Sequence, residues 1–106
     1  MTNVVFKKSD GFIVSGEISG HSGYAEEGSD IVCAAVSSVS WCILNGLESF
    51  LGEKINISQE DAFISFEIGS LTEEEKVKAE ALLQSMDMFF DSLTEQYPLF
   101  ISKSEV

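Results

Sequence analysis

The chain's single histidine and one of its two cysteines lie close together in a pattern that could support nucleophilic chemistry. His21 precedes Cys33 by twelve residues in the segment GHSGYAEEGSDIVCAAVS. A thiol attacks carbonyl carbon as the thiolate, and both a helix N-terminus and a neighbouring imidazole favour that charged form. Asp30 is a typical helix N-cap residue, which would place Cys33 in the first helical turn. Cys33 is therefore a candidate nucleophile, and His21 is a candidate general base that would later protonate a leaving amine.

Each of these residues also has a purely structural interpretation. Cysteine is among the most frequently buried residue types, and we expect Cys42, between Trp41 and Ile43, to lie in the core. Asp30 could orient the base, although the N-cap role is favoured. Ser37, one turn after Cys33, could face the site, but bonding to the helix backbone is the default for a helical serine.

The segment between the two candidates is expected to be a mobile loop. Residues 22–29 are small, acidic or glycine, apart from Tyr24, so little burial would offset the entropy of ordering them. Gly20, Gly23 and Gly28 match neither a dinucleotide fingerprint nor a Walker loop. Coverage of a groove fits better, with Ser22, Gly23, Tyr24 and Gly28 as substrate-loop residues and Tyr24 able to contact a bound peptide.

The surrounding pattern predicts an α+β domain in the order β-β-α-β-β-α-β, with two helices packed on a mainly antiparallel sheet. The Asp10-Gly11 pair indicates a hairpin, and Thr72 with Glu75 forms a capping box. The predicted strands are Asn3–Lys8, Gly11–Ser19, Lys54–Ser58, Ala62–Ile68 and Leu99–Ser102, and the helices run from Asp30 to about Leu51 and from Thr72 to about Glu95. Residues 1–106 are expected to form one domain.

The first helix is apolar on more than one side, which favours burial against the sheet and also against a second subunit, so we expect a homodimer. Its wide apolar face is predicted to comprise Ile31, Ala34, Ala35, Val39, Cys42, Ile43, Leu47, Phe50 and Leu51, and further apolar surface is expected from Val32, Val36, Trp41 and Leu44. A helix buried in the core of one chain is the simpler alternative. The core-facing stripe of the second helix is predicted to comprise Val77, Leu82, Met86, Phe89, Phe90 and Leu93.

Composition narrows the function classes. The net charge of −12, from 18 acidic and 6 basic residues, argues against nucleic-acid binding. It would favour encounter with a cationic partner, although general solubility explains the charge equally well. One histidine and two distant cysteines do not make a zinc site, and no metal or other cofactor is expected. If Cys33 and Cys42 lie on one helix, their side chains point in opposite directions and cannot form a disulfide, so both thiols are expected to stay reduced. Without a signal-peptide pattern or a long uncharged apolar run, we expect a cytoplasmic protein with no membrane contact.

The run Asp30-Ile31-Val32-Cys33-Ala34-Ala35-Val36-Ser37, with Gly20-His21 upstream, resembles the ribosomal-processing cysteine protease (Prp) family. The resemblance extends along essentially the full chain. It implies a homodimeric α+β endopeptidase that removes the N-terminal extension of a large-subunit ribosomal protein, cutting beside a phenylalanine-containing stretch. It also implies Cys33 as nucleophile and His21 as general base, with Gly20, Asp30 and Ser37 in supporting positions. Ser22 is a departure, because the family more often has alanine there.

A second hypothesis belongs to a different class. The acidic charge and the broadly apolar first helix would also suit a non-catalytic dimeric module that binds a basic ribosomal or assembly partner. The reactivity of Cys33 toward an alkylating reagent distinguishes the two hypotheses.

Overall fold

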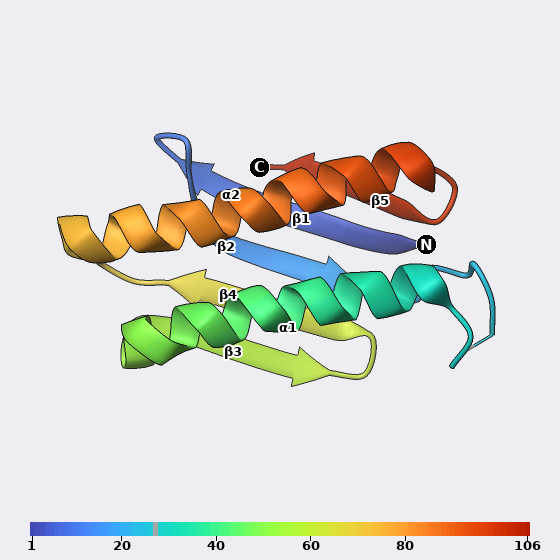
Figure 1. Ribbon diagram of the computed structural model, residues 1–106, viewed down its shortest axis with the longest axis horizontal. Helices are drawn as coiled ribbons and strands as arrows, with labels where there is room; N and C mark the ends of the chain where they lie inside the picture. The colour runs from blue at the N-terminus through green and yellow to red at the C-terminus, as the bar shows by residue number, and fades with distance from the viewer. Residues whose placement is uncertain (27) are drawn as a thin grey trace.

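A computed structural model describes residues 1–26 and 28–106, and in it two helices lie side by side across one face of a five-stranded sheet (Figure 1). The sheet order is β3-β4-β2-β1-β5; β1 pairs with β5 in parallel, and the other neighbours are antiparallel. The predicted α+β class and element order are confirmed. The elements are β1 Thr2–Ser9, β2 Phe12–Ser19, α1 Ile31–Leu51, the 3-10 turn η1 Gly52–Lys54, β3 Ile55–Glu60, β4 Phe63–Ile68, α2 Glu73–Gln96 and β5 Ile101–Glu105.

Tight turns fix the register of the two hairpins. Asp10 (φ 52°) and Gly11 (φ 79°) both adopt left-handed conformations, and Ser9 pairs with Phe12 across the turn. A two-residue turn with two positive φ angles matches the twist of the flanking strands, so the predicted Asp-Gly hairpin is confirmed. The β3–β4 turn likewise has a positive φ at Ala62 (54°), and it brings the end of this hairpin beside the end of β2.

The structure confirms the predicted ends of α1 but not the predicted buried face. Asp30 caps the N-terminus, and Gly52 ends the helix with a φ of 56°. Ile31, Ala34 and Cys42, which belong to the predicted wide apolar face, are exposed in the single chain. The prediction was wrong because Ala and Cys mark either face, whereas successive helical residues point about 100° apart. The side chains that face the sheet and α2 are Val32, Val36, Ser40, Ile43, Leu44, Leu47 and Leu51.

By length and composition alone, α1 with η1 is apolar enough to cross a membrane. A core helix passes the same test. Leu44 and Leu47 are fully buried within the domain, so the inward face of α1 belongs to a protein core.

The second helix begins at the predicted capping box. The Thr72 hydroxyl accepts the Glu75 N–H at 3.2 Å, and the Glu75 carboxylate accepts the Thr72 N–H at 2.9 Å. Val77 was wrongly placed in the core stripe and is 67% exposed, because it lies two residues from the buried Ala79 and therefore on the opposite side of the helix. The buried side chains of α2 are Ala79, Leu83, Met86, Phe90 and Leu93.

The last strand begins later than predicted. Residues 98–100 form a turn, Leu99 is 78% exposed, and β5 starts at Ile101. The strand extends to Glu105 because it pairs along β1, from Thr2 opposite Ile101 to Phe6 opposite Glu105. The third strand also begins one residue later than predicted, because Lys54 belongs to η1 rather than to β3.

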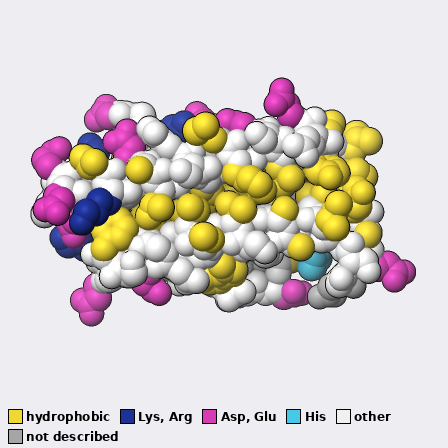
Figure 2. Space-filling model, in the orientation of Figure 1, with side chains coloured by type: hydrophobic (Ala, Val, Ile, Leu, Met, Phe, Trp, Pro, Cys, Tyr) yellow, Lys and Arg dark blue, Asp and Glu magenta, His cyan; other side chains and the backbone are white. Residues whose placement is uncertain are grey.

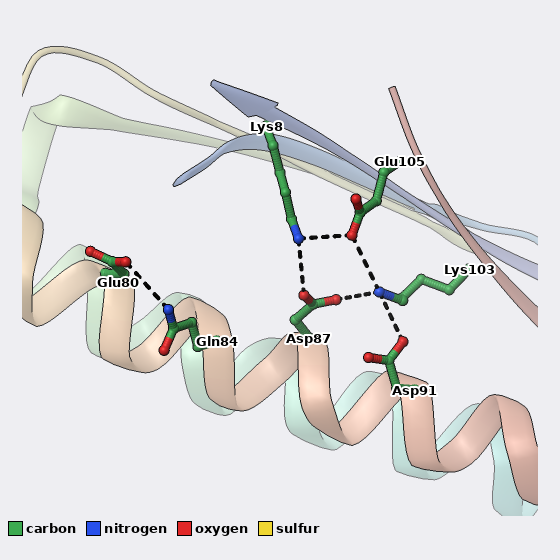
Figure 3. Close-up of polar contacts among 7 residues, drawn as sticks. All are labelled: Lys8, Glu80, Gln84, Asp87, Asp91, Lys103 and Glu105. Carbon is green, nitrogen blue, oxygen red and sulfur yellow. Dashed lines mark hydrogen bonds and ion pairs between the residues drawn. The ribbon is translucent and has the colours of Figure 1, made fainter. Parts of the chain in front are cut away.

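Ion pairs fasten α2 to the β1–β5 edge of the sheet (Figure 3). Lys103 contacts Asp87 and Asp91 of α2, and Lys8 contacts Asp87 and Glu105. The Lys103 side chain is 11% exposed, and although burial opposes its charge, the hydrogen bonds that it donates to the two aspartates raise the pKa of Lys103. The second half of α2 is therefore held against β5 and against the end of β1.

Candidate active site

A groove of about 550 Å³ lies between the N-terminal half of α1, the end of β2 and the β3–β4 hairpin. His21 and Cys33 both line this groove, so the fold brings the two sequence candidates to one site. The histidine, cyan in Figure 2, reaches the surface at the end of the molecule where α1 begins.

Cys33 lies in the first turn of α1, as the sequence predicted. Its backbone N–H donates to Asp30 Oδ1 at 2.9 Å, and the residue is half-buried. The Cys33 sulfur accepts the Ser22 N–H at 3.2 Å. The sulfur therefore lies beside a backbone N–H and near the N-terminus of α1, where positive partial charge faces the position of a nucleophile.

His21 is exposed and lies two residues after the end of β2. Within residues 1–26 and 28–106, no hydrogen bond joins the imidazole to the Cys33 sulfur, whose partner is instead the Ser22 amide. Proton transfer between the two side chains therefore requires a small movement of the histidine or of the loop, as is common before substrate binds.

The backbone before His21 requires glycine. Gly20 has a φ of 87°, and a Cβ atom there would lie 2.6 Å from the Met1 carbonyl oxygen. The Gly20 N–H donates to the Ala62 carbonyl at 2.8 Å, which ties the end of β2 to the β3–β4 turn. The positive φ and the close approach of the Met1 carbonyl account for this glycine.

Asp30 is the polar centre of the loop. Its Oδ1 accepts the Cys33 N–H, and its Oδ2 accepts the Ser22 hydroxyl and the amides of Tyr24 and Ala25, at 3.1 and 3.4 Å. Although burial opposes the charge, the hydrogen bonds from Ser22, Cys33 and Ala25 lower the pKa of Asp30 from 3.8 to about 2. The N-cap prediction is confirmed, and the carboxylate contacts the loop backbone and Ser22 rather than His21.

The loop is more firmly anchored than its composition predicted. Ser22 is 2% exposed, and the Tyr24 ring packs edge-on against Tyr97 and Phe100, with centroids 5.5 and 5.2 Å apart. The expectation of little local burial was wrong because the partners come from Asp30 and from the turn after α2, which is remote in sequence. Glu27, in the same predicted loop, lies outside the described residues.

The remaining sequence candidates are divided between the groove and its surroundings. Gly23, Gly28 and Ser37 line the groove, whereas Tyr24 packs on the turn after α2. Ser37 is exposed, and its hydroxyl has no hydrogen-bond partner in the described part of the chain, so the default expectation of backbone bonding was wrong. Across that same part, no group of three or more His, Cys, Asp or Glu side chains could hold a metal ion.

Sequence reasoning missed several residues of the groove wall. Trp41 from α1 and Ile64 from β4 supply apolar surface, Thr2 reaches the groove from β1, and Glu60 and Asp61 form an acidic rim at the β3–β4 turn. These residues are far from His21 and Cys33 in sequence, and the pairing of β2 with β4 brings the hairpin to the site. Asp61, in the short connection between two predicted strands, was the single available signal.

Comparison with known proteins identifies the family. The model of the cysteine protease Prp family matches residues 1–102. The chain is 30% identical over 94 residues to the ribosomal processing cysteine protease Prp of Bacillus subtilis (strain 168), covering 86% of this chain and 84% of that protein. It is also 30% identical over 80 residues to the Prp of Staphylococcus aureus (strain Mu50), covering 76% of this chain and 74% of the relative.

A solved structure extends the likeness to the whole fold. The crystal structure of an essential ribosomal processing protease Prp from S. aureus, in complex with a covalently linked product peptide, superposes with a TM-score of 0.88 at 25% identity, and all of each chain is covered. The groove with its thiol and imidazole agrees with this assignment. The chain therefore belongs to the cysteine protease Prp family.

Proposed function

We propose that this protein is an endopeptidase that removes the N-terminal extension of a large-subunit ribosomal protein precursor, with Cys33 and His21 as a catalytic dyad. The observation that carries the proposal is the shared groove of the two side chains, in which a backbone N–H already points at the Cys33 sulfur. The relatives in B. subtilis and S. aureus are named ribosomal processing proteases, and the S. aureus structure holds a covalently linked product peptide.

In the proposed reaction, His21 accepts the thiol proton and the Cys33 thiolate attacks the scissile carbonyl carbon, forming a C–S bond. The His21 imidazolium then protonates the leaving amine as the C–N bond breaks, which releases the downstream peptide and leaves a thioester. A water molecule, deprotonated by His21, attacks the thioester carbon. The thiolate leaves and the N-terminal fragment is released as a carboxylate.

The supporting residues have distinct proposed roles. Asp30 holds the loop and the start of α1 in register, Gly20 permits the sharp turn before His21, and Ser37 offers a free hydroxyl to the bound peptide. Residues 22–29 are proposed to close over the substrate and bring His21 to the sulfur. Hydrogen exchange of this loop with and without a cleavage-site peptide checks the closure; equal, strong protection in both states would contradict it.

Alkylation with iodoacetamide across pH tests the dyad. We expect Cys33 to react faster than free cysteine at neutral pH, and this advantage to disappear in His21→Ala.

Cys33→Ala should abolish cleavage, while the matched control Cys42→Ala should keep both cleavage and stability. Cys42 is exposed, so its truncation leaves no cavity, contrary to the core position expected from sequence. A Cys33 no more reactive than free cysteine, in a protein that binds the precursor without cutting it, would favour the non-catalytic module.

A homodimer and a cytoplasmic location are proposed with this function. Apolar side chains extend along the two helices in Figure 2, and the exposed Ile31 of α1 belongs to the surface that a second subunit would cover. Sedimentation at micromolar concentration should give a dimer mass, and a monomer would contradict this part of the proposal. Two unpaired thiols suit a reducing compartment, and cell fractionation checks the location.

A further inference from the structure

Thr2 occupies a position where the strand pattern calls for an apolar side chain. Thr2, Val4 and Phe6 alternate as the inward-facing residues of β1, and each is at most 2% exposed. A hydroxyl buried at such a position is destabilising unless it finds a hydrogen-bond partner. The Thr2 hydroxyl donates to the Gly20 carbonyl at 3.0 Å.

The accepting carbonyl belongs to the peptide unit that links Gly20 to His21. On its other side, Gly20 donates its own N–H to the Ala62 carbonyl at 2.8 Å, and the Met1 carbonyl lies too close for any side chain at position 20. The rotation of the Gly20–His21 peptide plane sets the direction in which the histidine side chain leaves the backbone. The Thr2 hydroxyl is the side-chain contact that restrains this rotation.

We propose that Thr2 is a positioning residue for His21: its buried hydroxyl fixes the Gly20–His21 peptide, so that the imidazole is directed into the groove that Cys33 also lines. The proposal rests on the proposed function, because it assumes that His21 is the general base. Thr2 also lines the groove, although it has no part in the bond-making steps.

Thr2 is itself held in place by the sheet. The Thr2 N–H donates to the Phe100 carbonyl at 3.0 Å, and Thr2 pairs with Ile101 at the start of the parallel β1–β5 ladder. The Phe100 and Tyr97 rings pack against Tyr24, which follows His21 by three residues in the sequence. The turn after α2 therefore contacts the chain on both sides of His21 in the sequence. It binds Thr2, whose hydroxyl holds Gly20, and it packs against Tyr24.

Misplacing a catalytic group by about 1 Å can lower a rate by a factor of the order of 100. A role confined to stability would make a different prediction, because the folded fraction would then react at the normal rate. Turnover and pH dependence therefore separate the positioning role from a purely structural one.

The experiment compares Thr2→Val, which keeps the shape and removes the hydroxyl, with Thr2→Ser, which keeps the hydroxyl. Cleavage of a quenched fluorescent peptide from the ribosomal precursor, containing the phenylalanine stretch, reports kcat and KM. We expect Thr2→Val to lower kcat about tenfold with little change in KM, and to reduce the His21-dependent rate advantage in iodoacetamide alkylation at neutral pH. Thr2→Ser should restore most of both.

Thr94→Val is the matched control, since the Thr94 hydroxyl donates to the Phe90 carbonyl at 2.8 Å within α2. It should leave kcat and alkylation unchanged. If Thr2→Val does not fold by circular dichroism, the pair Thr2→Ser and Thr2→Ala gives the same comparison, because these variants differ by one hydroxyl.

The outcomes distinguish this inference from the proposed function. If His21→Ala is inactive while folded Thr2→Val keeps the wild-type kcat and alkylation profile, the positioning role is overturned and the dyad stands. If His21→Ala cleaves the peptide normally, the dyad itself fails, and the inference fails with it.

Discussion

At the scale of single residues, the site depends on the Asp30 carboxylate, which holds the loop in place and takes no part in the proposed bond-making steps. Asp30 is 8% exposed and accepts hydrogen bonds from Ser22, Tyr24, Ala25 and Cys33. A neutral amide at this position would accept at one atom and repel at the other, because its NH₂ group faces donors. The charge of Asp30 is therefore required by the number of donors that surround it.

This predicts the outcome of Asp30→Asn. We expect cleavage to fall at least about tenfold because the loop amides lose their common acceptor, and the free energy of unfolding to fall by on the order of 1–2 kcal/mol at neutral pH. The pKa of Asp30 is lower in the folded protein, about 2 against 3.8, so its contribution is complete above pH 3.8 and is lost as the pH falls toward 2. Denaturant titrations at several pH values measure this; a gap between wild type and variant that persists at pH 2 would contradict it.

For Ser40 we expect the opposite effect, because its replacement should stabilise the protein. Its hydroxyl is fully buried in α1, and within the described residues it has no hydrogen-bond partner. Ser40→Ala removes the desolvated hydroxyl and should raise the free energy of unfolding by about 1 kcal/mol. Ser38→Ala, an exposed serine two residues earlier, controls for the higher helix propensity of alanine. Equal stabilisation by both variants would mean that the buried hydroxyl carries no penalty.

At the scale of elements, local signals predicted local structure and failed where distant segments meet. The Asp30 cap, the Thr72–Glu75 capping box and the Asp10-Gly11 turn depend on neighbours within a few residues, and all three are present. The faces of the helices were predicted less well, because Ala and Cys carry little information about burial. The contacts of Thr2 with Gly20 and of Tyr24 with Tyr97 join residues far apart in sequence, so no local pattern indicates them.

The loop and the turn after α2 should therefore behave as one unit. Tyr24→Ala removes the ring that packs on Tyr97 and Phe100, and we expect faster amide exchange at residues 22–25 and a lower rate of cleavage. Tyr97→Phe keeps the ring and should leave both unchanged. Hydrogen exchange with mass spectrometry measures the loop directly. Unchanged exchange in Tyr24→Ala would show that the Asp30 hydrogen bonds alone hold the loop.

At the scale of the whole molecule, the charge of −12 becomes useful if the substrate is basic. A field of one sign attracts an oppositely charged chain and weakens as salt rises. Two carboxylates, Glu60 and Asp61, lie on the rim of the groove itself, where they would act at short range on a basic residue of the bound peptide. A long-range attraction by the whole molecule and a local contact at the rim of the groove predict different effects when the carboxylates are replaced.

The last prediction separates them with two double variants of equal charge. Glu60→Gln with Asp61→Asn changes the rim, and Glu53→Gln with Glu73→Gln makes the same change at the opposite end of the molecule (Figure 1). If the rim contacts the peptide, the first variant should raise KM severalfold for a lysine-containing precursor peptide and flatten its salt dependence, while the second should have a much smaller effect. Replacing the lysines of the peptide by glutamine should remove the difference between the variants. Equal effects of both variants would mean that the charge acts as a diffuse field and that the groove rim does not select basic residues.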